Sequence, residues 1–540
     1  MYTKLIIIAV ILNGISWVHA KDSARPNILF AFADDWGRHA SVYAKTDGAG
    51  TENDVIKTPH FDAISQRGVL FNNAFVNAPS CTPCRSSILS GQHFWRTGRA
   101  AILQGAQWDT AIPTWPLLLK GGGYHIGYTW KVWSPGTPRD APYGGAVNAF
   151  SKAGSSFNGF SQTVTNLVKG GKSVIEAKQV LMEQVRGNFR DMLAGREKGQ
   201  PFAYWFGPTN VHRKWVKGSG KSLWSINPDK LEGKMPPFLP DVPAVREDFA
   251  DYLGEAMAFD MALGVLVEEL QKIGEYQNTI IAVSGDHGPA GFPYGKCNLY
   301  DFGSRVALTV AGPGVKGGRV VDDLVSLPDL AATFLEVASV KVPEVMTSRS
   351  IWPTLTSAES GLADKSRTQV FMGRERHVAS ARAGQLPYPQ RAIRTQNHLF
   401  IINFKPERYP LGDHYNLGTD KEPDAGRLTA NTFVTIADED AGPTKAWIVT
   451  NRHTPSVKPF FERAYGKRPR EELYELKEDP YQMKNVADVI DRKEVVSALR
   501  KRLMDELKKT NDPRLVEGGR FFETPPMAGP VGKAKGRKKK

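Results

Sequence analysis

The stretch NILFAFADDWG, residues 27–37, joins an unbroken apolar run to two adjacent carboxylates. The apolar residues from Ile28 to Phe32 do not alternate with polar ones, which is typical of a strand buried on both faces of a parallel sheet. Asp34 and Asp35 follow at the carboxyl end of this predicted strand. Because ligands of open α/β sheets bind at that edge, the stretch predicts both a fold class and the place of a polar site.

A helix and a second strand downstream extend this pattern. Apolar residues between Glu247 and Ile273 recur at helical spacing and predict one long amphipathic helix, which Gly274 ends. The apolar strand TIIAVS at 279–284 follows and leads into GDHG at 285–288. Strand, helix and strand in this order predict an α/β fold with a large, mostly parallel central sheet covered by helices.

The composition indicates a large globular protein. The chain has 540 residues, 41% of them hydrophobic, so we expect one large domain and a smaller one. Three cysteines, Cys81, Cys84 and Cys297, are too few for a disulfide scaffold. The formal net charge is +14, and six of the positive charges lie in the last eight residues.

The first twenty residues predict export. Lys4 precedes an apolar stretch at 5–12, and Val18-His19-Ala20 has the small-x-small pattern of a cleavage site, so residues 1–20 are predicted to be a signal peptide. No segment reaches the roughly 20 apolar residues of a membrane span, so none is predicted. The expected compartment is the periplasm or the extracellular medium. The basic tail at 526–540 is predicted to be disordered, or else to bind a polyanion, for which export makes nucleic acid the least expected choice.

The carboxylates predicted at the sheet edge indicate a metal. Asp34, Asp35 and Asp286 would repel one another if they clustered without a counter-ion, and oxygen ligands of this kind suit calcium or magnesium. Each feature alone is ordinary, since an Asp-Asp pair before a Trp-Gly turn is more often a loop or a helix cap. His287 alone is as often a surface residue as a ligand. The acids by themselves leave both interpretations open.

A second motif, SCTPCRSSILSG at 80–91, carries more information. Its C-x-x-C, Cys81 to Cys84, could be a thiol redox pair or half of a zinc site. Zinc is disfavoured because only one other cysteine exists, and a redox pair leaves Arg85 and the aspartates without a role. As C-x-P-x-R followed by Ser-Ser-x-Leu-Ser-Gly, the stretch resembles the signature of the sulfatase family, in which the cysteine is oxidised to formylglycine.

The resemblance covers several motifs in the family's order. It runs from about Pro26 to Ala338 and includes the strand-end aspartates, the GDHG, Lys296 in GKCNLY and PDLAATF at 328–334. A separate stretch, ELYELKEDPYQMKNVA at 472–487, is similar to the family's C-terminal motif. It implies an alkaline-phosphatase-like sandwich at 21–345 and a smaller α+β domain at 346–525. For the smaller domain we predict few strands and one closing helix from about Asp491 to Lys509.

The resemblance also implies a chemistry. The hydrated aldehyde presents two hydroxyls, one that attacks sulfur and one that then loses a proton so that the diol collapses and expels sulfate. The implied cofactor is one calcium ion, a Lewis acid held by Asp34, Asp35, Cys81, Asp286 and His287. The implied sulfate-binding cations are Arg85, Lys131 and Lys296, and the implied general acid is His212. The implied maturation partner is a formylglycine-generating or anaerobic sulfatase-maturating enzyme.

Four positions depart from the family pattern, one of them Trp130, which stands in place of the glycine of G-K-x-H. Val211 stands where a proline usually precedes the histidine, and Cys84 stands where serine or alanine usually precedes the arginine. Trp133 is the larger departure, because the family's G-K-x-H pattern places a histidine there, on a formylglycine hydroxyl. The base that collapses the sulfated diol is therefore unassigned. A catalytically weakened relative that binds sulfated glycans stays open as an alternative.

The predicted substrate is a sulfated glycan. His212-Arg213, Asn-Leu-Tyr at 298–300 and PLLL at 116–119 resemble the heparan N-sulfatases, which act on N-sulfated glucosamine. An O-sulfated polysaccharide is the alternative within the family. A phosphate-ester hydrolase on the same fold is disfavoured, because such enzymes normally have threonine or serine in place of Cys81.

Overall fold

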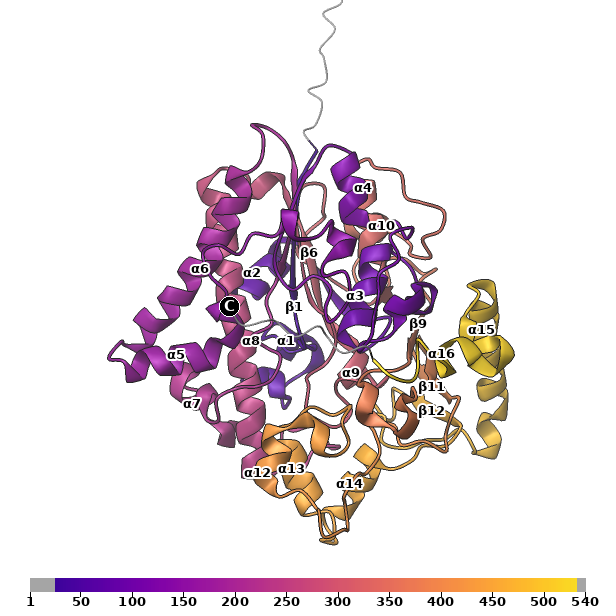
Figure 1. The fold of residues 1–540 in the computed structure, drawn as a ribbon. Helices are drawn as coiled ribbons and strands as arrows, with labels where there is room; N and C mark the ends of the chain where they lie inside the picture. The colour runs from indigo at the N-terminus through magenta and orange to yellow at the C-terminus, as the bar shows by residue number, and fades with distance from the viewer. Residues whose placement is uncertain (1–24, 532–540) are drawn as a thin grey trace, which may run out of the picture.

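The structure, a computed structural model, describes residues 25–531. The predicted signal peptide at 1–20 and most of the predicted basic tail lie outside these residues. Figure 1 shows a large sheet between two layers of helices, with the last part of the chain forming a smaller sheet to one side. None of the helices in the described part is long and apolar enough to cross a membrane.

The large sheet has eight strands in the order β3-β4-β1-β5-β6-β2-β7, with β8 paired to β2. Its parallel half consists of β3 (His125–Trp130), β4 (Phe202–Gly207), β1 (Asn27–Ala33) and β5 (Thr279–Gly285). The sheet is mixed because β6 (Arg305–Ala311) runs antiparallel to β5 and to β2 (Val69–Phe75). The short strands β7 (Arg319–Val321) and β8 (Val325–Ser326) are parallel to β2. The predicted mostly parallel sheet is confirmed.

Helices cover both faces of β1, which explains its unbroken apolar run. Leu29, Ala31 and Ala33 face a core shared with α2 (Pro59–Arg67), α5 (Phe160–Lys169), α6 (Val174–Ala194) and α8 (Pro243–Lys272). Ile28, Phe30 and Phe32 face the opposite core, shared with α3 (Cys81–Ser90), α4 (Trp115–Gly121) and α10 (Asp329–Val337). Because successive side chains of a strand point to opposite faces, a strand between two cores needs an apolar residue at every position.

The long predicted helix is confirmed as α8, which begins earlier than expected, at Pro243. Proline suits the first helical position because its missing N–H would have no intrahelical partner there. The remaining helices of the first 360 residues are short: α1 (Tyr43–Asp47), α7 (Ser219–Trp224), α9 (Asp301–Ser304) and α11 (Trp352–Thr356).

The smaller sheet is antiparallel, in the order β12-β11-β10-β9. Its strands are β9 (Gln369–Arg374), β10 (Gln390–Thr395), β11 (His398–Asn403) and β12 (Glu471–Glu475), and α15 (Lys493–Lys509) packs against it. The helix predicted from about Asp491 to Lys509 is confirmed as α15. Four short helices were not predicted: α12 (Ala425–Ala430), α13 (Pro443–Thr450), α14 (Lys458–Tyr465) and α16 (Arg520–Glu523). Helices this short do not show an apolar period that can be recognised in sequence.

A buried arginine joins the smaller sheet to the loop that carries Lys296. Arg374, at the end of β9, donates to the carbonyl of Cys297 at 2.7 Å and to that of Pro410 at 2.9 Å, and pairs with Asp438. The segment containing Asp438 is thereby held against the edge of the large sheet. This contact brings a part of the chain beyond residue 346 to the candidate site.

Candidate active site

Two loops at the carboxyl edge of the large sheet bring the strand-end acids together. Asp34 and Asp35 follow β1, and Asp286 and His287 follow the neighbouring β5. The backbone N–H of Asp35 donates to Asp286 Oδ1 at 2.8 Å. The loops approach so closely that a Cβ on Gly285 would lie 1.9 Å from the carbonyl oxygen of Trp36. All four side chains are buried, as the sequence pattern predicts for a site set into the sheet edge.

Cys81 is the first residue of α3 and points at these loops. Its Sγ lies 3.4 Å from His287 Nε2 and 3.9 Å from Asp35 Oδ1. Burial, followed by the charge of Asp34, raises the pKa of the Cys81 thiol well above its ordinary value. An unmodified thiol here stays protonated and is a poor nucleophile at neutral pH. Cys84 is also buried with a raised pKa, and no cysteine forms a disulfide, so the arrangement does not favour a redox pair.

Arg85 bridges two of the acids from inside the protein. Its Nε donates to Asp286 Oδ2 at 2.9 Å and its Nη2 to Asp34 Oδ1 at 3.0 Å, while Nη1 donates to the carbonyl of Lys131 at 3.1 Å. The side chain is fully buried. The guanidinium therefore orients the two carboxylates in a fixed, forked geometry.

Lys131 approaches Asp34 from the more open side. Its Nζ lies 2.6 and 2.7 Å from the two oxygens of that carboxylate. Burial works to raise the pKa of Asp34, but Lys131 and then Arg85 outweigh it and hold the pKa well below its ordinary value. A cavity of about 390 Å³ opens beside Lys131, lined also by Arg139, Asp140 and Asn158. It offers space for a substrate next to the cluster.

Lys296 connects the remaining acid to the candidate general acid. Its Nζ lies 3.2 Å from Asp35 Oδ2 and 3.1 Å from His212 Nε2. Burial lowers the pKa of Lys296, but the charges of Asp35 and Asp440 outweigh it, so the pKa is raised well above its ordinary value. His212 is more accessible, with a side chain 31% exposed, and its Nδ1 lies 2.6 Å from the carbonyl of Arg213. Nδ1 is therefore the protonated nitrogen, and Nε2 accepts from Lys296.

The structure brings all nine predicted site residues into one set of contacts, which we call the Cys81 cluster: Asp34, Asp35, Cys81, Arg85, Lys131, His212, Asp286, His287 and Lys296. Trp133 is not part of it. Its indole is buried in the core beneath α3, and the indole N–H donates to Ser86 Oγ at 2.7 Å. The tryptophan therefore fills the core and supplies no base.

The cluster has the donors that a hard divalent cation requires. Two groups of three side chains each have ligand atoms within 4.8 Å of one another, and both include Cys81: one adds Asp35 and His287, the other Asp34 and Asp286. His287 Nε2 is 3.4 Å from Asp35 Oδ1 and 3.5 Å from Asp286 Oδ1. Ligands at right angles around an ion with bonds of about 2.4 Å would be roughly 3.4 Å apart. These residues fit a calcium ion, although Asp34 is shared with Lys131 and Arg85.

Two further residues reach the cluster that the sequence did not indicate. Asp440 Oδ2 lies 3.2 Å from Lys296 Nζ, on the segment held by Arg374. His377 Nδ1 lies 2.8 Å from the hydroxyl of Ser80, next to Cys81, and burial lowers the pKa of His377 to about 3, so its ring is neutral. The only sequence signal for Asp440 is the acidic run Asp438-Glu439-Asp440, which is ordinary in a surface loop.

Comparison with known proteins agrees with this geometry. The sequence profile of the sulfatase family matches residues 26–340. The chain is 26% identical to human N-sulphoglucosamine sulphohydrolase over 526 residues, which is 91% of each chain. It is 25% identical to an ulvan-active sulfatase of Formosa agariphila over 407 residues, covering 70% of this chain and 73% of the relative.

The fold has known counterparts as well. A solved protein in complex with its substrate D-glucosamine-2-N,6-O-disulfate superposes with a TM-score of 0.59 and 18% identity, covering 91% of this chain and all of that one. At this identity the similarity establishes the fold, which is the α/β sandwich with a large mixed sheet and a smaller antiparallel one.

Proposed function

Because the chain belongs to the sulfatase family, we propose that it removes sulfate from a sulfated glycan through a formylglycine made from Cys81. N-sulfated glucosamine is the proposed sugar, supported by the similarity to the human sulphohydrolase along nearly its whole length. An O-sulfated polysaccharide is the alternative, supported by the ulvan-active relative. The signal-like start of the sequence supports a periplasmic or extracellular location.

One observation carries the proposal: Cys81, the first residue of α3, lies buried among three carboxylates and three cations, one of which, Lys131, lines an open cavity. The raised pKa of its thiol argues against chemistry by the thiolate itself. The hydrate of a formylglycine supplies one hydroxyl to bond to sulfur and a second whose deprotonation releases sulfate. The proposal therefore includes a maturation enzyme as a partner.

The acids of the cluster are proposed to hold one calcium ion, with Asp34, Asp35, Asp286 and His287 as ligands and residue 81 beside them. When bound, calcium supplies positive charge against a sulfate oxygen and against the attacking hydroxyl. Arg85 keeps Asp34 and Asp286 in position from within the core. Lys131 and Lys296 are the proposed sulfate-binding cations, because their ammonium groups contact Asp34 and Asp35 and their side chains, 10% and 4% exposed, are less enclosed than that of Arg85.

His212 is proposed to protonate the leaving oxygen or nitrogen of the sugar. Its Nδ1–H donates to the carbonyl of Arg213, which fixes the ring, and Lys296 donates to Nε2. When Lys296 turns to a sulfate oxygen, Nε2 is free to hold the proton that it gives to the leaving atom. The exposure of this side chain is consistent with a role at the substrate's sugar side.

The position of Trp133 keeps a second function open, that of a weakened relative which binds sulfated glycans without efficient turnover. Since Trp133 lies in the core, the base that the family has at this position is missing from the chain's cluster. Added calcium and maturation enzyme would separate the two, because a binder would gain no turnover from either.

The test is sulfate release by protein co-expressed with a formylglycine-generating enzyme, with mass spectrometry of the peptide containing Cys81. We expect release from N-sulfated glucosamine and none from Cys81→Ala. Release from 6-O-sulfated glucosamine alone would keep the sulfatase and discard the N-sulfated sugar. Complete conversion to formylglycine without release from a wide panel of sulfated glycans would contradict the enzymatic proposal and favour the binder.

A further inference from the structure

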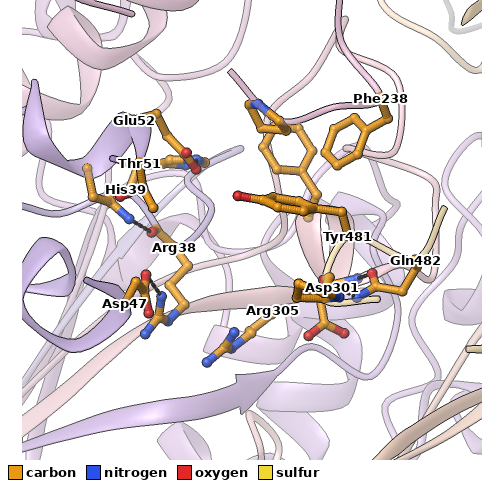
Figure 2. A pocket seen from close by; sticks show the side chains of 14 residues that line it. Arg38, His39, Asp47, Thr51, Glu52, Phe238, Asp301, Arg305, Tyr481 and Gln482 are labelled. Atoms are coloured by element: carbon orange, nitrogen blue, oxygen red, sulfur yellow. Dashed lines mark hydrogen bonds and ion pairs between the residues drawn. The ribbon is translucent and has the colours of Figure 1, made fainter. Parts of the chain in front are cut away.

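A second pocket, of about 340 Å³, shares no residue with the Cys81 cluster. Four distant parts of the chain form it: the loop after β1, the segment with Pro236 and Phe238, α9 with the start of β6, and the segment from Pro480 to Gln482. Figure 2 shows the guanidinium groups of Arg38 and Arg305 on one side of it and the rings of Phe238 and Tyr481 on another. The volume lies at the small end of ligand pockets, roughly 300–1,000 Å³, and suits one sugar ring.

Two of the acids of this pocket already have cationic partners. Arg38 pairs with Asp47, and Arg394 donates from behind the wall to both oxygens of Asp301, at 3.1 and 3.0 Å. Glu52 lies 3.4 Å from His39 Nε2. An added cation would therefore find no free carboxylate pair and would face two guanidinium groups.

Arg305 differs from these paired groups. Its Nε donates to the carbonyl of Asn72 at 2.7 Å, and its two terminal nitrogens have no hydrogen-bond partner among residues 25–531. Burial, followed by repulsion from Arg38, lowers the pKa of Arg305 to about 9, which still leaves the guanidinium charged at neutral pH. A partly buried cation with two free donor nitrogens is costly in free energy until an anion accepts from it.

The opposite wall offers an aromatic surface. The ring of Phe238 stacks on Tyr294 at 4.5 Å between centroids, and Tyr481 meets the edge of Phe238 at 6.3 Å. Tyr481 is 38% exposed, so its ring is accessible. The backbone next to it is held by Gln482, whose carbonyl accepts from the hydroxyl of Tyr294 at 3.3 Å and whose N–H donates to the carbonyl of Asp479 at 3.1 Å. A rigid, accessible aromatic ring is the usual platform for the apolar face of a sugar.

We propose that this pocket is an accessory binding site for one anionic sugar unit of a glycan, with the sulfate or uronate carboxylate on Arg305 and the ring on Tyr481. The choice of a glycan rests on the proposed function, whereas the anion site rests on Arg305 alone. Bidentate acceptance from a guanidinium suits both anionic groups. The site would hold a polymer at a unit other than the one being cleaved.

The first experiment measures binding by calorimetry to the full chain carrying Cys81→Ala, so that no turnover occurs. The probe is a heparin-derived tetrasaccharide with uronate and sulfate groups. We expect two classes of site, of which Arg305→Gln and Tyr481→Ala each weaken one by about tenfold or more and leave the other unchanged. Arg305→Lys should restore part of the affinity. Arg520→Gln, the same change at an exposed arginine, should have no effect.

Chemically edited probes identify the anion. A carboxyl-reduced tetrasaccharide and a desulfated one are compared on the same variants. If binding of the carboxyl-reduced form still depends on Arg305, the anion is the sulfate, and if binding of the desulfated form does, it is the carboxylate. Equal binding of the tetrasaccharide to the parent protein and to both pocket variants would overturn the proposal. Inorganic sulfate binding as tightly as the tetrasaccharide, with no effect of Tyr481→Ala, would overturn the sugar assignment.

Kinetics provide an independent readout in matured enzyme. Arg305→Gln should leave kcat/KM for a sulfated monosaccharide unchanged and lower it for the polymer about tenfold. Equal effects on both substrates would contradict an accessory site. If the matured parent enzyme has no activity, the proposed function fails while the binding experiment still decides the pocket.

Discussion

At the scale of residues, the Cys81 cluster is a balance of buried charges. Its three carboxylates, Asp34, Asp35 and Asp286, and the adjoining Asp440 face the three cations Arg85, Lys131 and Lys296, which leaves one net negative charge when the histidines are neutral. A bound dication would reverse the sign to one net positive charge. The cluster would then attract an anionic ester or sulfamate, which the protein without metal would repel.

Asp440 is the first residue to test, because it shares Lys296 with Asp35, one of the proposed calcium ligands. In Asp440→Asn, Lys296 loses one of its two carboxylates and moves toward Asp35, away from the position where it would meet sulfate. A charge-assisted hydrogen bond of about 1.5–3 kcal/mol predicts a loss of roughly 10- to 100-fold in kcat/KM. The measurement is steady-state sulfate release by matured enzyme.

The matched control is Asp491→Asn, at an exposed aspartate in the short turn before α15, which should leave the kinetics unchanged. An unchanged kcat/KM in Asp440→Asn would mean that Lys296 is held by Asp35 alone.

At the scale of elements, the ends of β1 and β5 must meet without a side chain between them. In Gly285→Ala the new Cβ would lie 1.9 Å from the carbonyl oxygen of Trp36, so the two loops that carry the acids must separate. We expect a loss of about 3 kcal/mol in stability and loss of sulfatase activity. Thermal unfolding and sulfate release check this. Gly121→Ala, which meets no atom within 4 Å, should match the parent protein, and equal behaviour of the two variants would contradict the close approach.

The packing of α2 on α8 predicts a dependence on pH. Asp260 of α8 accepts from the backbone N–H groups of Phe61 at 2.7 Å and His60 at 3.2 Å, at the start of α2. Burial raises the pKa of Asp260 from 3.8 to about 7. The folded state therefore binds a proton more tightly than the unfolded state, and this contribution to stability is complete below about pH 4 and is lost as the pH rises toward 7.

Asp260→Asn removes this titration. Between pH 5 and pH 8, the thermal midpoint of the variant should fall less than that of the parent protein. The variant's midpoint should therefore rise relative to the parent's as the pH rises. Thermal scans at a fixed rate measure the effect. Asp229→Asn, at an exposed aspartate, should follow the parent protein. A parallel pH dependence of Asp260→Asn and the parent would show that Asp260 is ionised throughout.

At the scale of the whole molecule, stability should depend on the metal, since two sheet-edge loops and α3 meet at one set of acids. Calcium at about 100 times its dissociation constant would add about 2.7 kcal/mol to the free energy of unfolding. We expect calcium to raise the thermal midpoint, EDTA to lower it, and Asp286→Asn to lose the response while Asp491→Asn keeps it. A midpoint indifferent to calcium and EDTA in the parent protein would contradict the calcium site.

Much of the large sheet and most of the candidate site could be predicted from the amino-acid sequence. Unbroken apolar runs marked β1 and β5 because each strand lies between two helical layers, and the acids after them marked the edge. The short helices between Ala425 and Tyr465 were missed, since their few turns show no clear period. Asp440 was missed because an acidic run has the same appearance in any exposed loop.

The sequence by itself determined the family, the α/β fold and the nine residues of the Cys81 cluster, because strand burial and a reactive motif depend on residues close together in the chain. Only the tertiary structure decided that Trp133 lies in the core, that Arg85 bridges two acids, and that Asp440 and Arg305 each reach a site. Those outcomes depend on contacts between segments far apart in sequence. Such contacts are set by how the helices and the smaller sheet pack, which no local pattern records.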